Sequence, residues 1–201
     1  ADDLAVFGKM LGIDSPRVFG QSFGGMVAMH FAARYPARIS KLILSSTAAQ
    51  FRLDETVKIM RKLGGDRAAD VSHRFFSKPS RDAYDAYGDV CLPLYSNPNA
   101  PEAAGFRERA IERPEVALHF FSDEMASMDM RTEIANITCP TLVIGGTLDP
   151  VTPTVCSEVI TDSIGKNACL HMFEGCGHGP HRDDPDGAEK GEESATWPYK
   201  E

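Results

Sequence analysis

Residues 17–36 read Arg-Val-Phe-Gly-Gln-Ser-Phe-Gly-Gly-Met-Val-Ala-Met-His-Phe-Ala-Ala-Arg-Tyr-Pro. The short apolar run Arg17–Gly20 predicts a strand, and Gly24–Tyr35 predicts a helix that the following proline ends. Between them lies the motif Gly20-Gln21-Ser22-Phe23-Gly24. A Gly-x-Ser-x-Gly turn is strained and pushes its serine hydroxyl into the open, because the two glycines avoid collisions where the chain reverses. The motif predicts that Ser22 is a nucleophile; the alternative is a glycine-rich helix entry with an incidental serine.

The strand and helix signals around this motif predict a parallel sheet. A second apolar strand is expected at Lys41–Leu44, at the spacing of a parallel β-α-β unit. The pattern resumes at Cys139–Gly146, continues through a helix at Val155–Ile160 and ends with a strand at Ala168–Phe173. Apolar residues at helical spacing predict a further helix at Asp2–Gly12. The fold class is therefore α/β, with about four parallel strands.

The stretch from about residue 47 to residue 131 has a different character, with many charges and no good strand. It is too long for a plain loop, and we interpret it as a helical insertion. Its helices are expected at Leu53–Leu63, Ala68–Phe76, Arg81–Cys91 and Glu115–Met125, with a break at Gly64-Gly65. The predicted organisation is a core part at 1–47, the insertion at 48–131 (the cap segment), a second core part at 132–186, and a polar, disordered tail at 187–201.

A serine hydroxyl needs a base to take its proton and an acid to orient that base. Asp149 follows the strand that ends at Gly146, and His178 follows the next strand, so both would lie at the carboxyl edge of the sheet. Asp149-Pro150 is also a common turn dipeptide, and His178 could be an ordinary loop histidine. His181 is the one rival as general base. We prefer His178 because its flanking glycines let the loop bend the imidazole back over the serine.

Three stretches carry a family resemblance: Gly-Gln-Ser-Phe-Gly-Gly at 20–25, Pro-Thr-Leu-Val-Ile-Gly-Gly-x-x-Asp-Pro-Val-Thr-Pro at 140–153, and Gly-His-Gly-Pro-His-Arg-Asp at 177–183. They resemble the α/β-hydrolase superfamily over about residues 1 to 186. Residues 91–96 and 113–131 are more particularly similar to proline iminopeptidase-like (S33) members.

The resemblance implies that Ser22 is the nucleophile, His178 the general base and Asp149 the orienting acid. It also implies that the backbone N–H of Phe23 is one oxyanion donor and that the cap segment shapes the substrate pocket. The implied substrate is a small molecule or a peptide, cleaved at an ester, amide or small-peptide bond through an acyl-enzyme. If the peptidase resemblance extends to substrate, acidic cap residues would hold a free amino terminus, and the candidates are Glu112, Glu115, Asp123 and Glu124. A solvated helix face is the alternative for all four.

Two departures from the family pattern lead to the expectation that the sequence is a fragment. The family's first four strands, and the His-Gly type motif that gives a second oxyanion N–H, have no counterpart, and neither does its closing helix after residue 186. The strand at residues 17–20 would then be an exposed apolar edge, prone to aggregation. We expect this chain alone to be insoluble or nearly inactive, whereas a parent with roughly eighty more amino-terminal residues would be active.

Composition limits the partners and cofactors. A formal net charge of -8 argues against a nucleic-acid or anionic-membrane surface, and no apolar run is long enough to span a bilayer. The five scattered cysteines indicate a reducing, cytoplasmic setting. No cofactor is expected, and the oligomeric state is left open.

Two alternatives remain. Five possible zinc ligands between residues 169 and 181 (Cys169, His171, Cys176, His178 and His181) match no common zinc spacing, so we expect no metal. A non-catalytic ligand-binding protein of the same fold, or an inactive truncated remnant, is the alternative to the enzyme.

Overall fold

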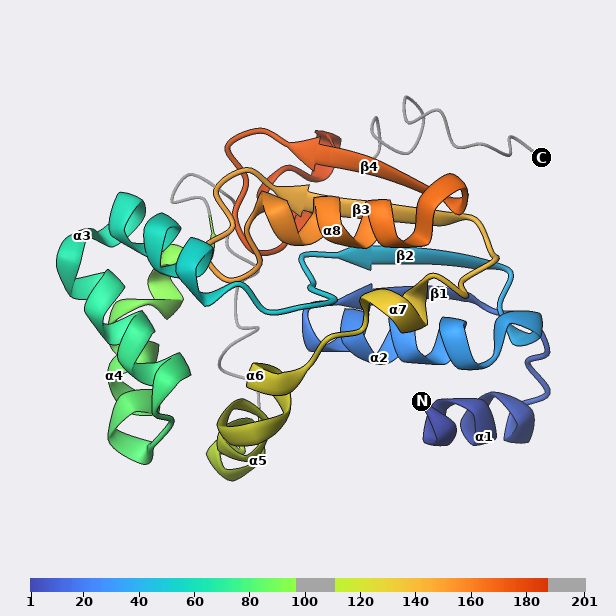
Figure 1. The fold of residues 1–201 in the computed structure, drawn as a ribbon, viewed down its shortest axis with the longest axis horizontal. Helices are drawn as coiled ribbons and strands as arrows, with labels where there is room; N and C mark the ends of the chain where they lie inside the picture. Colours follow the sequence, from blue (N-terminus) through green and yellow to red (C-terminus); the bar gives the residue numbers. More distant parts are fainter. Residues whose placement is uncertain (97–110, 188–201) are drawn as a thin grey trace.

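Four parallel strands form one sheet in the computed structural model, which describes residues 1–96 and 111–187. The strands are β1 (Arg17–Gln21), β2 (Lys41–Ser45), β3 (Thr141–Gly146) and β4 (Ala168–Phe173), and they lie in that order across the sheet. Figure 1 shows all four running in the same direction. The predicted parallel α/β fold is confirmed. Each strand lies within two residues of its predicted bounds because short apolar runs ended by Gly or Pro mark buried strands well.

One face of the sheet carries the main hydrophobic core. Alternate strand residues such as Val18, Leu42, Leu44 and Val143 point to this face. It is covered by α2 (Phe23–Arg34), α7 (Arg131–Ile134) and α8 (Thr154–Ile164), which Figure 1 shows in front of the strands, and α1 (Asp2–Met10) packs beside α2. This packing fixes the orientation of α2, and therefore the direction in which its first residue meets the strand ends.

The opposite face is more thinly covered. Its smaller core is formed by residues of β3, β4 and the loop after β4 (Leu142, Ile144, Phe173 and Cys176). Phe19 of β1 lies on the same face, in register with Ile43, and is 53% exposed. The short helix α9 (Pro180–Asp183) places the His181 ring edge-on to Phe19, with ring centroids 5.5 Å apart. Since β1 pairs only with β2 in the described part of the chain, an apolar strand forms one edge of this sheet.

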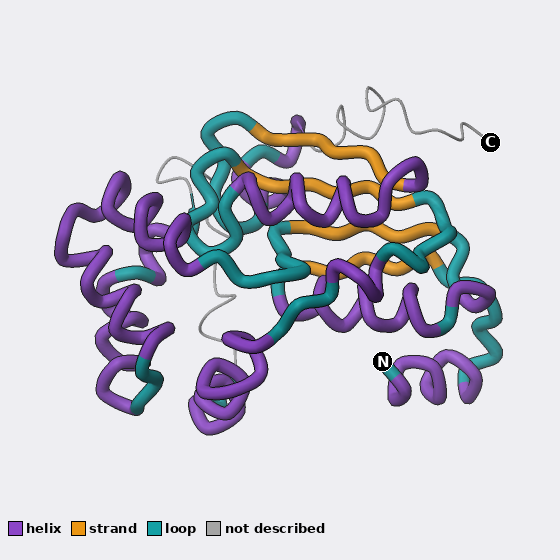
Figure 2. Tube along the Cα trace, viewed as in Figure 1, coloured by secondary structure: helices purple, strands orange, loops and turns teal. Residues whose placement is uncertain are grey.

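The cap-segment helices that precede α7 lie beyond the carboxyl ends of the strands, as Figures 1 and 2 show. They are α3 (Leu53–Ser77), α4 (Arg81–Val90), α5 (Pro114–His119) and α6 (Met125–Ser127). The predicted break in the first of them is present: Gly65 has φ 71° and ψ -169°, and the helical path changes direction there. The helix expected at Glu115–Met125 is instead two short helices joined by a wide π-type turn at Phe120–Glu124.

The remaining elements are single 3-10 turns at Pro36–Arg38, Leu92–Leu94 and Gly165–Asn167. Across the described residues of the cap segment, strand-like pairing is limited to an isolated bridge between Gln50 and Asp129, where the chain leaves and rejoins the sheet. The predicted polar tail lies outside the described residues apart from Gly187. None of the helices that the structure describes combines the length and apolar character needed to cross a bilayer.

Candidate active site

Ser22 occupies the turn between β1 and α2. Its backbone has φ 52° and ψ -123°, a left-handed conformation that costs a non-glycine residue about 1–3 kcal/mol. β2 and the loop after it hold the turn: the Ser22 N–H donates to the Ser45 carbonyl at 3.0 Å, and the Thr47 hydroxyl donates to the Ser22 carbonyl at 2.7 Å. The side chain is half-buried at the carboxyl edge of the sheet. The strained serine expected from the sequence motif is therefore present.

Close packing around this turn requires Gly20 and Gly25, whereas the motif indicates Gly20 and Gly24. A Cβ at Gly20 would lie 2.6 Å from the Gly24 carbonyl oxygen, so the first motif glycine is required. A Cβ at Gly24 would meet nothing within 4 Å, whereas one at Gly25 would lie 2.6 Å from the Thr47 side chain. The close contact between the start of α2 and the loop after β2 therefore depends on Gly25, and the second motif glycine, Gly24, has space for a larger side chain.

Asp149 and His178 form a buried pair. His178 Nδ1 lies 3.0 Å and 2.9 Å from the two carboxylate oxygens, and the two residues are 6% and 1% exposed. Oδ1 also accepts from the N–H groups of Val151 and Thr152 at 2.9 Å, and Oδ2 accepts from the Thr152 hydroxyl at 2.8 Å. Both carboxylate oxygens therefore accept hydrogen bonds from the loop at 151–152. These hydrogen bonds fix the orientation of the carboxylate toward the imidazole.

These contacts decide the charge of Asp149. Burial alone would raise the pKa of its carboxyl, but the adjacent His178 and the backbone donors of Val151 and Thr152 outweigh burial and lower the pKa below its ordinary value of 3.8. Asp149 is therefore ionised at neutral pH. An ionised partner on Nδ1 favours the imidazole tautomer that keeps its proton there, which leaves Nε2 free to accept a proton.

Asp149 is hydrogen-bonded to His178 and not to His181, the other candidate general base. The His181 ring packs against Phe19 on the thinly covered face, and its Nδ1 is buried without a hydrogen-bond partner. Burial, with a smaller contribution from Arg182, lowers the pKa of His181. The hydrogen bonds of the His178 imidazole in the described structure all involve Nδ1, and none joins Nε2 to the Ser22 hydroxyl. Catalytic hydrogen bonds are often long before substrate binds.

The other candidates from the sequence do not gather at this site. Glu112, Glu115, Asp123 and Glu124 are all exposed. Glu115 lies 4.0 Å from Arg113, and Glu124 lies 3.9 Å from His119, which is the geometry of a solvated helix face. All five cysteines are free thiols. Within residues 1–96 and 111–187, no group of three or more His, Cys, Asp and Glu side chains is arranged to hold a metal ion.

Sequence reasoning missed two contributors to the site. Thr152 gives Asp149 two of its hydrogen bonds, and an Asp followed three positions later by Thr is a turn signal that could have indicated this. Tyr95 of the cap segment contacts His178 with both its carbonyl oxygen and its ring. No local signal indicates that contact, because the two residues are far apart in the sequence.

Comparison with known protein families identifies the family of this chain. The sequence profile of the family described as serine aminopeptidase, S33, matches residues 2–185. The chain belongs to the S33 serine aminopeptidase family.

Among curated relatives of this S33 chain is a 2-hydroxy-6-oxo-6-phenylhexa-2,4-dienoate hydrolase of Comamonas testosteroni. It is 31% identical over an alignment of 187 positions, and the match covers 87% of this chain and 60% of the relative. A proline iminopeptidase of Thermoplasma volcanium is 28% identical over 199 residues, covering 87% of this chain and 62% of the relative. The S33 chain thus spans about three fifths of the length of the curated relatives that it matches.

Solved structures show the same fold. An α/β fold family hydrolase of Bacillus anthracis superposes with a TM-score of 0.65 at 19% identity, covering 94% of this chain and 70% of the other. A thermophilic esterase of Thermogutta terrifontis gives a TM-score of 0.58 at 22% identity, covering 96% and 68%. The architecture is that of part of an α/β-hydrolase fold, as the sequence predicted.

Proposed function

We propose that this S33 chain carries the nucleophile, base and acid of a serine hydrolase, with Ser22, His178 and Asp149 in those roles. The observation that carries the proposal is the buried Asp149–His178 pair at the same sheet edge as a serine held at positive φ. A strained serine alone is compatible with a structural turn. A buried ionised carboxylate that orients a histidine alone is compatible with a structural ion pair. Their combination at one edge is what acyl transfer requires.

The proposed chemistry is acyl transfer through an ester on Ser22. Ser22 Oγ attacks the carbonyl carbon of the substrate while its proton passes to His178 Nε2. The ionised Asp149 stabilises the imidazolium that forms, and the leaving group departs with the proton that His178 gives up. The acyl group then remains on Ser22 Oγ as an ester. Water, deprotonated by the same imidazole, attacks the acyl carbon. The bond from that carbon to Ser22 Oγ then breaks, His178 returns the proton to Oγ, and the acid product leaves.

The developing oxyanion lies at the amino end of α2. The Phe23 N–H is the first of that helix and has no intrahelical acceptor, so it is available to donate. The helix dipole adds positive potential at the same place. A single such donor contributes about 10²–10³ in rate in related chemistry.

The substrate class is an ester, an amide or a small peptide. The names of two relatives, an iminopeptidase and a phenyl-substituted dienoate hydrolase, indicate the range of substrates within the family. The exposure of the four acidic cap residues does not favour capture of a free amino terminus, so we place small esters ahead of peptides. We expect p-nitrophenyl esters to be cleaved faster than prolyl p-nitroanilide, and Glu115→Gln to change neither rate more than about twofold.

Labelling with a fluorophosphonate tests the proposal. We expect one adduct per chain, located at Ser22 by peptide mass spectrometry, abolished by Ser22→Ala and reduced at least a hundredfold by His178→Ala. The matched controls are Ser127→Ala and His73→Ala, which remove exposed residues of α6 and α3 and should leave labelling unchanged. The labelling is carried out on the longer parent protein, because this chain alone is expected to be nearly inactive. A folded parent that is not labelled at Ser22 would instead favour a ligand-binding protein without turnover.

A further inference from the structure

The cap segment contacts each of the three loops that carry the proposed site. The Phe120 ring lies edge-on to Phe23, with centroids 5.0 Å apart, and the Thr56 hydroxyl donates to the Val151 carbonyl at 3.1 Å. The third contact, between Tyr95 and His178, involves both backbone and ring. It is the one that reaches a proposed catalytic side chain directly.

We propose that Tyr95 is a positioning residue that holds the His178 imidazole in its productive orientation, an inference that rests on the function proposed above. The His178 N–H donates to the Tyr95 carbonyl oxygen at 2.6 Å, which fixes the backbone of the histidine. The Tyr95 ring meets the imidazole edge-on, with centroids 5.2 Å apart and an interplanar angle of 70°. Asp149 holds the imidazole only through Nδ1, so the ring contact limits rotation about that hydrogen bond.

The backbone contact depends on a bare glycine. A Cβ at Gly177 would collide with the Tyr95 carbonyl oxygen, so no larger residue fits while Tyr95 stays where it is. The Gly177 N–H is held from the other side by the Asp183 carboxylate at 2.7 Å, and Arg182 donates to the His178 carbonyl at 2.7 Å. Hydrogen bonds with α9 on one side and with Tyr95 on the other therefore hold residues 177–178, the loop that carries the histidine (the histidine loop).

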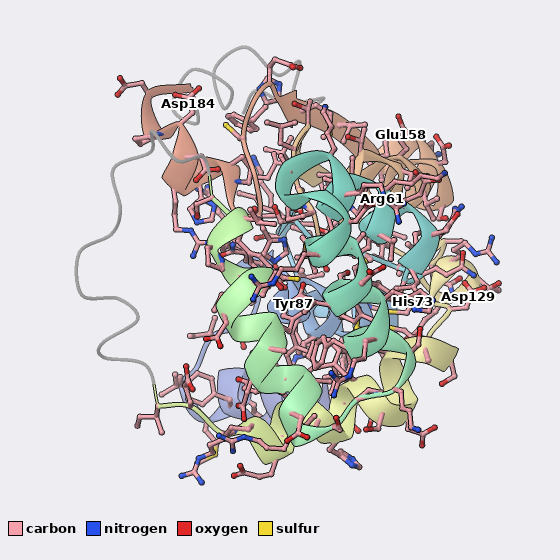
Figure 3. All side chains as sticks on the ribbon, turned by 90° about the vertical axis from the view of Figure 1, so that its left-hand side faces the viewer. Arg61, His73, Tyr87, Asp129, Glu158 and Asp184 are labelled. Carbon is pink, nitrogen blue, oxygen red and sulfur yellow. The ribbon has the colours of Figure 1, made fainter. Side chains whose placement is uncertain are left out.

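Tyr95 is itself anchored in the cap segment. Its hydroxyl is hydrogen-bonded to that of Tyr87 on α4 at 2.8 Å, and Tyr87 is buried against Phe75 and Phe76 of α3. Figure 3 shows Tyr87 between α4 and α3. Burial raises the pKa of both phenols, so both are neutral and one can donate to the other. A displacement of α4 would thus be passed to the imidazole through a buried hydrogen bond.

The test compares removal of the ring with removal of the hydroxyl. We expect Tyr95→Ala to lower the fluorophosphonate labelling rate of Ser22 and the kcat for a p-nitrophenyl ester about tenfold, with KM within about threefold. Tyr95→Phe, which keeps ring and carbonyl, should restore the rate to within about threefold of wild type. Tyr84→Ala is the matched control, because Tyr84 lies on α4, the helix of Tyr87, and packs on Phe75.

A second measurement does not depend on turnover. In protein labelled with ¹⁵N-histidine, the Nδ1 proton of His178 should give a low-field signal that persists in Tyr95→Phe and Tyr84→Ala and is broadened by exchange in Tyr95→Ala. If Tyr95→Ala only lowers the melting temperature, with the labelling rate and this signal unchanged, Tyr95 is structural and the inference is overturned. If Tyr95→Ala does not fold, Tyr95→Leu replaces it. If wild-type Ser22 is not labelled at all, the proposed function fails, and the Nδ1 signal alone decides the role of Tyr95.

Discussion

Asp149→Asn removes one charge from the site and leaves its shape almost unchanged. In the native site Oδ1 accepts two backbone N–H groups, so the asparagine must place its carbonyl oxygen there. Its NH₂ group then faces His178 Nδ1 and the Thr152 hydroxyl. An amide donor toward Nδ1 stabilises the tautomer with the proton on Nε2, which cannot accept the proton of Ser22.

The expected loss follows from that tautomer reversal. In serine proteases the comparable exchange lowers kcat about 10⁴-fold, and we expect about 10³–10⁴ here, or about 4–5.5 kcal/mol of transition-state stabilisation. Steady-state kinetics with a p-nitrophenyl ester measures it, with circular dichroism to confirm that the variant is folded. Asp129→Asn is the control, because this exposed aspartate pairs with Arg131 and lies outside the site. A loss of less than tenfold in a folded Asp149→Asn variant would refute the assigned role of the carboxylate.

Three further predictions concern stability and solubility. Gly25→Ala should destabilise the protein by about 1–3 kcal/mol, because its Cβ would lie 2.6 Å from Thr47. Gly24→Ala should be neutral or stabilising, because its Cβ would meet nothing within 4 Å. Thermal melts compare the two variants, and equal melting temperatures would contradict this packing argument. On α1 the apolar residues Val6, Phe7 and Met10 are exposed, Met10 by 80%. Met10→Lys should raise the concentration at which light scattering detects aggregation while leaving the melting temperature unchanged, and an unaltered onset would count against these exposed residues as a cause of aggregation. The pKa of Asp149 is lowered on folding, so its ionised form contributes stability that is complete above the unfolded-state pKa and is lost as pH falls through the lower folded-state value. The difference in free energy of unfolding between wild type and Asp149→Asn should therefore shrink between about pH 5 and pH 2 in urea titrations, and a constant difference would refute this linkage.

Local patterns were sufficient for most of the fold. Buried parallel strands are short apolar runs, and the helix break at Gly65 follows from a glycine pair inside a helical pattern. The wide turn at Phe120–Glu124 was missed because its residues have ordinary helical preferences and the irregularity involves no glycine or proline. There the packing of the two Phe rings at 120 and 121 competes with regular helical geometry.

The site was predictable to the extent that sheet topology fixes it. Parallel strands bring their carboxyl ends to one edge, so the order Ser22, Asp149, His178 was enough to expect the Asp149–His178 contact that the structure contains. Residues that act across the chain left no such signal. Gly25 matters only because Thr47 lies against it, and Tyr95 only because the cap segment folds back onto the histidine loop.

β2 and β3 are neighbours in the sheet although the entire cap segment separates them in the chain. The entropy of closing such a loop grows only logarithmically, so doubling its length costs about 0.6 kcal/mol. Caps of quite different size could therefore be exchanged at this position during evolution with little effect on the sheet. The exchange has one condition: a replacement cap must bring a carbonyl oxygen and a flat ring to the place that Tyr95 occupies, or the histidine of the inherited sheet loses its support.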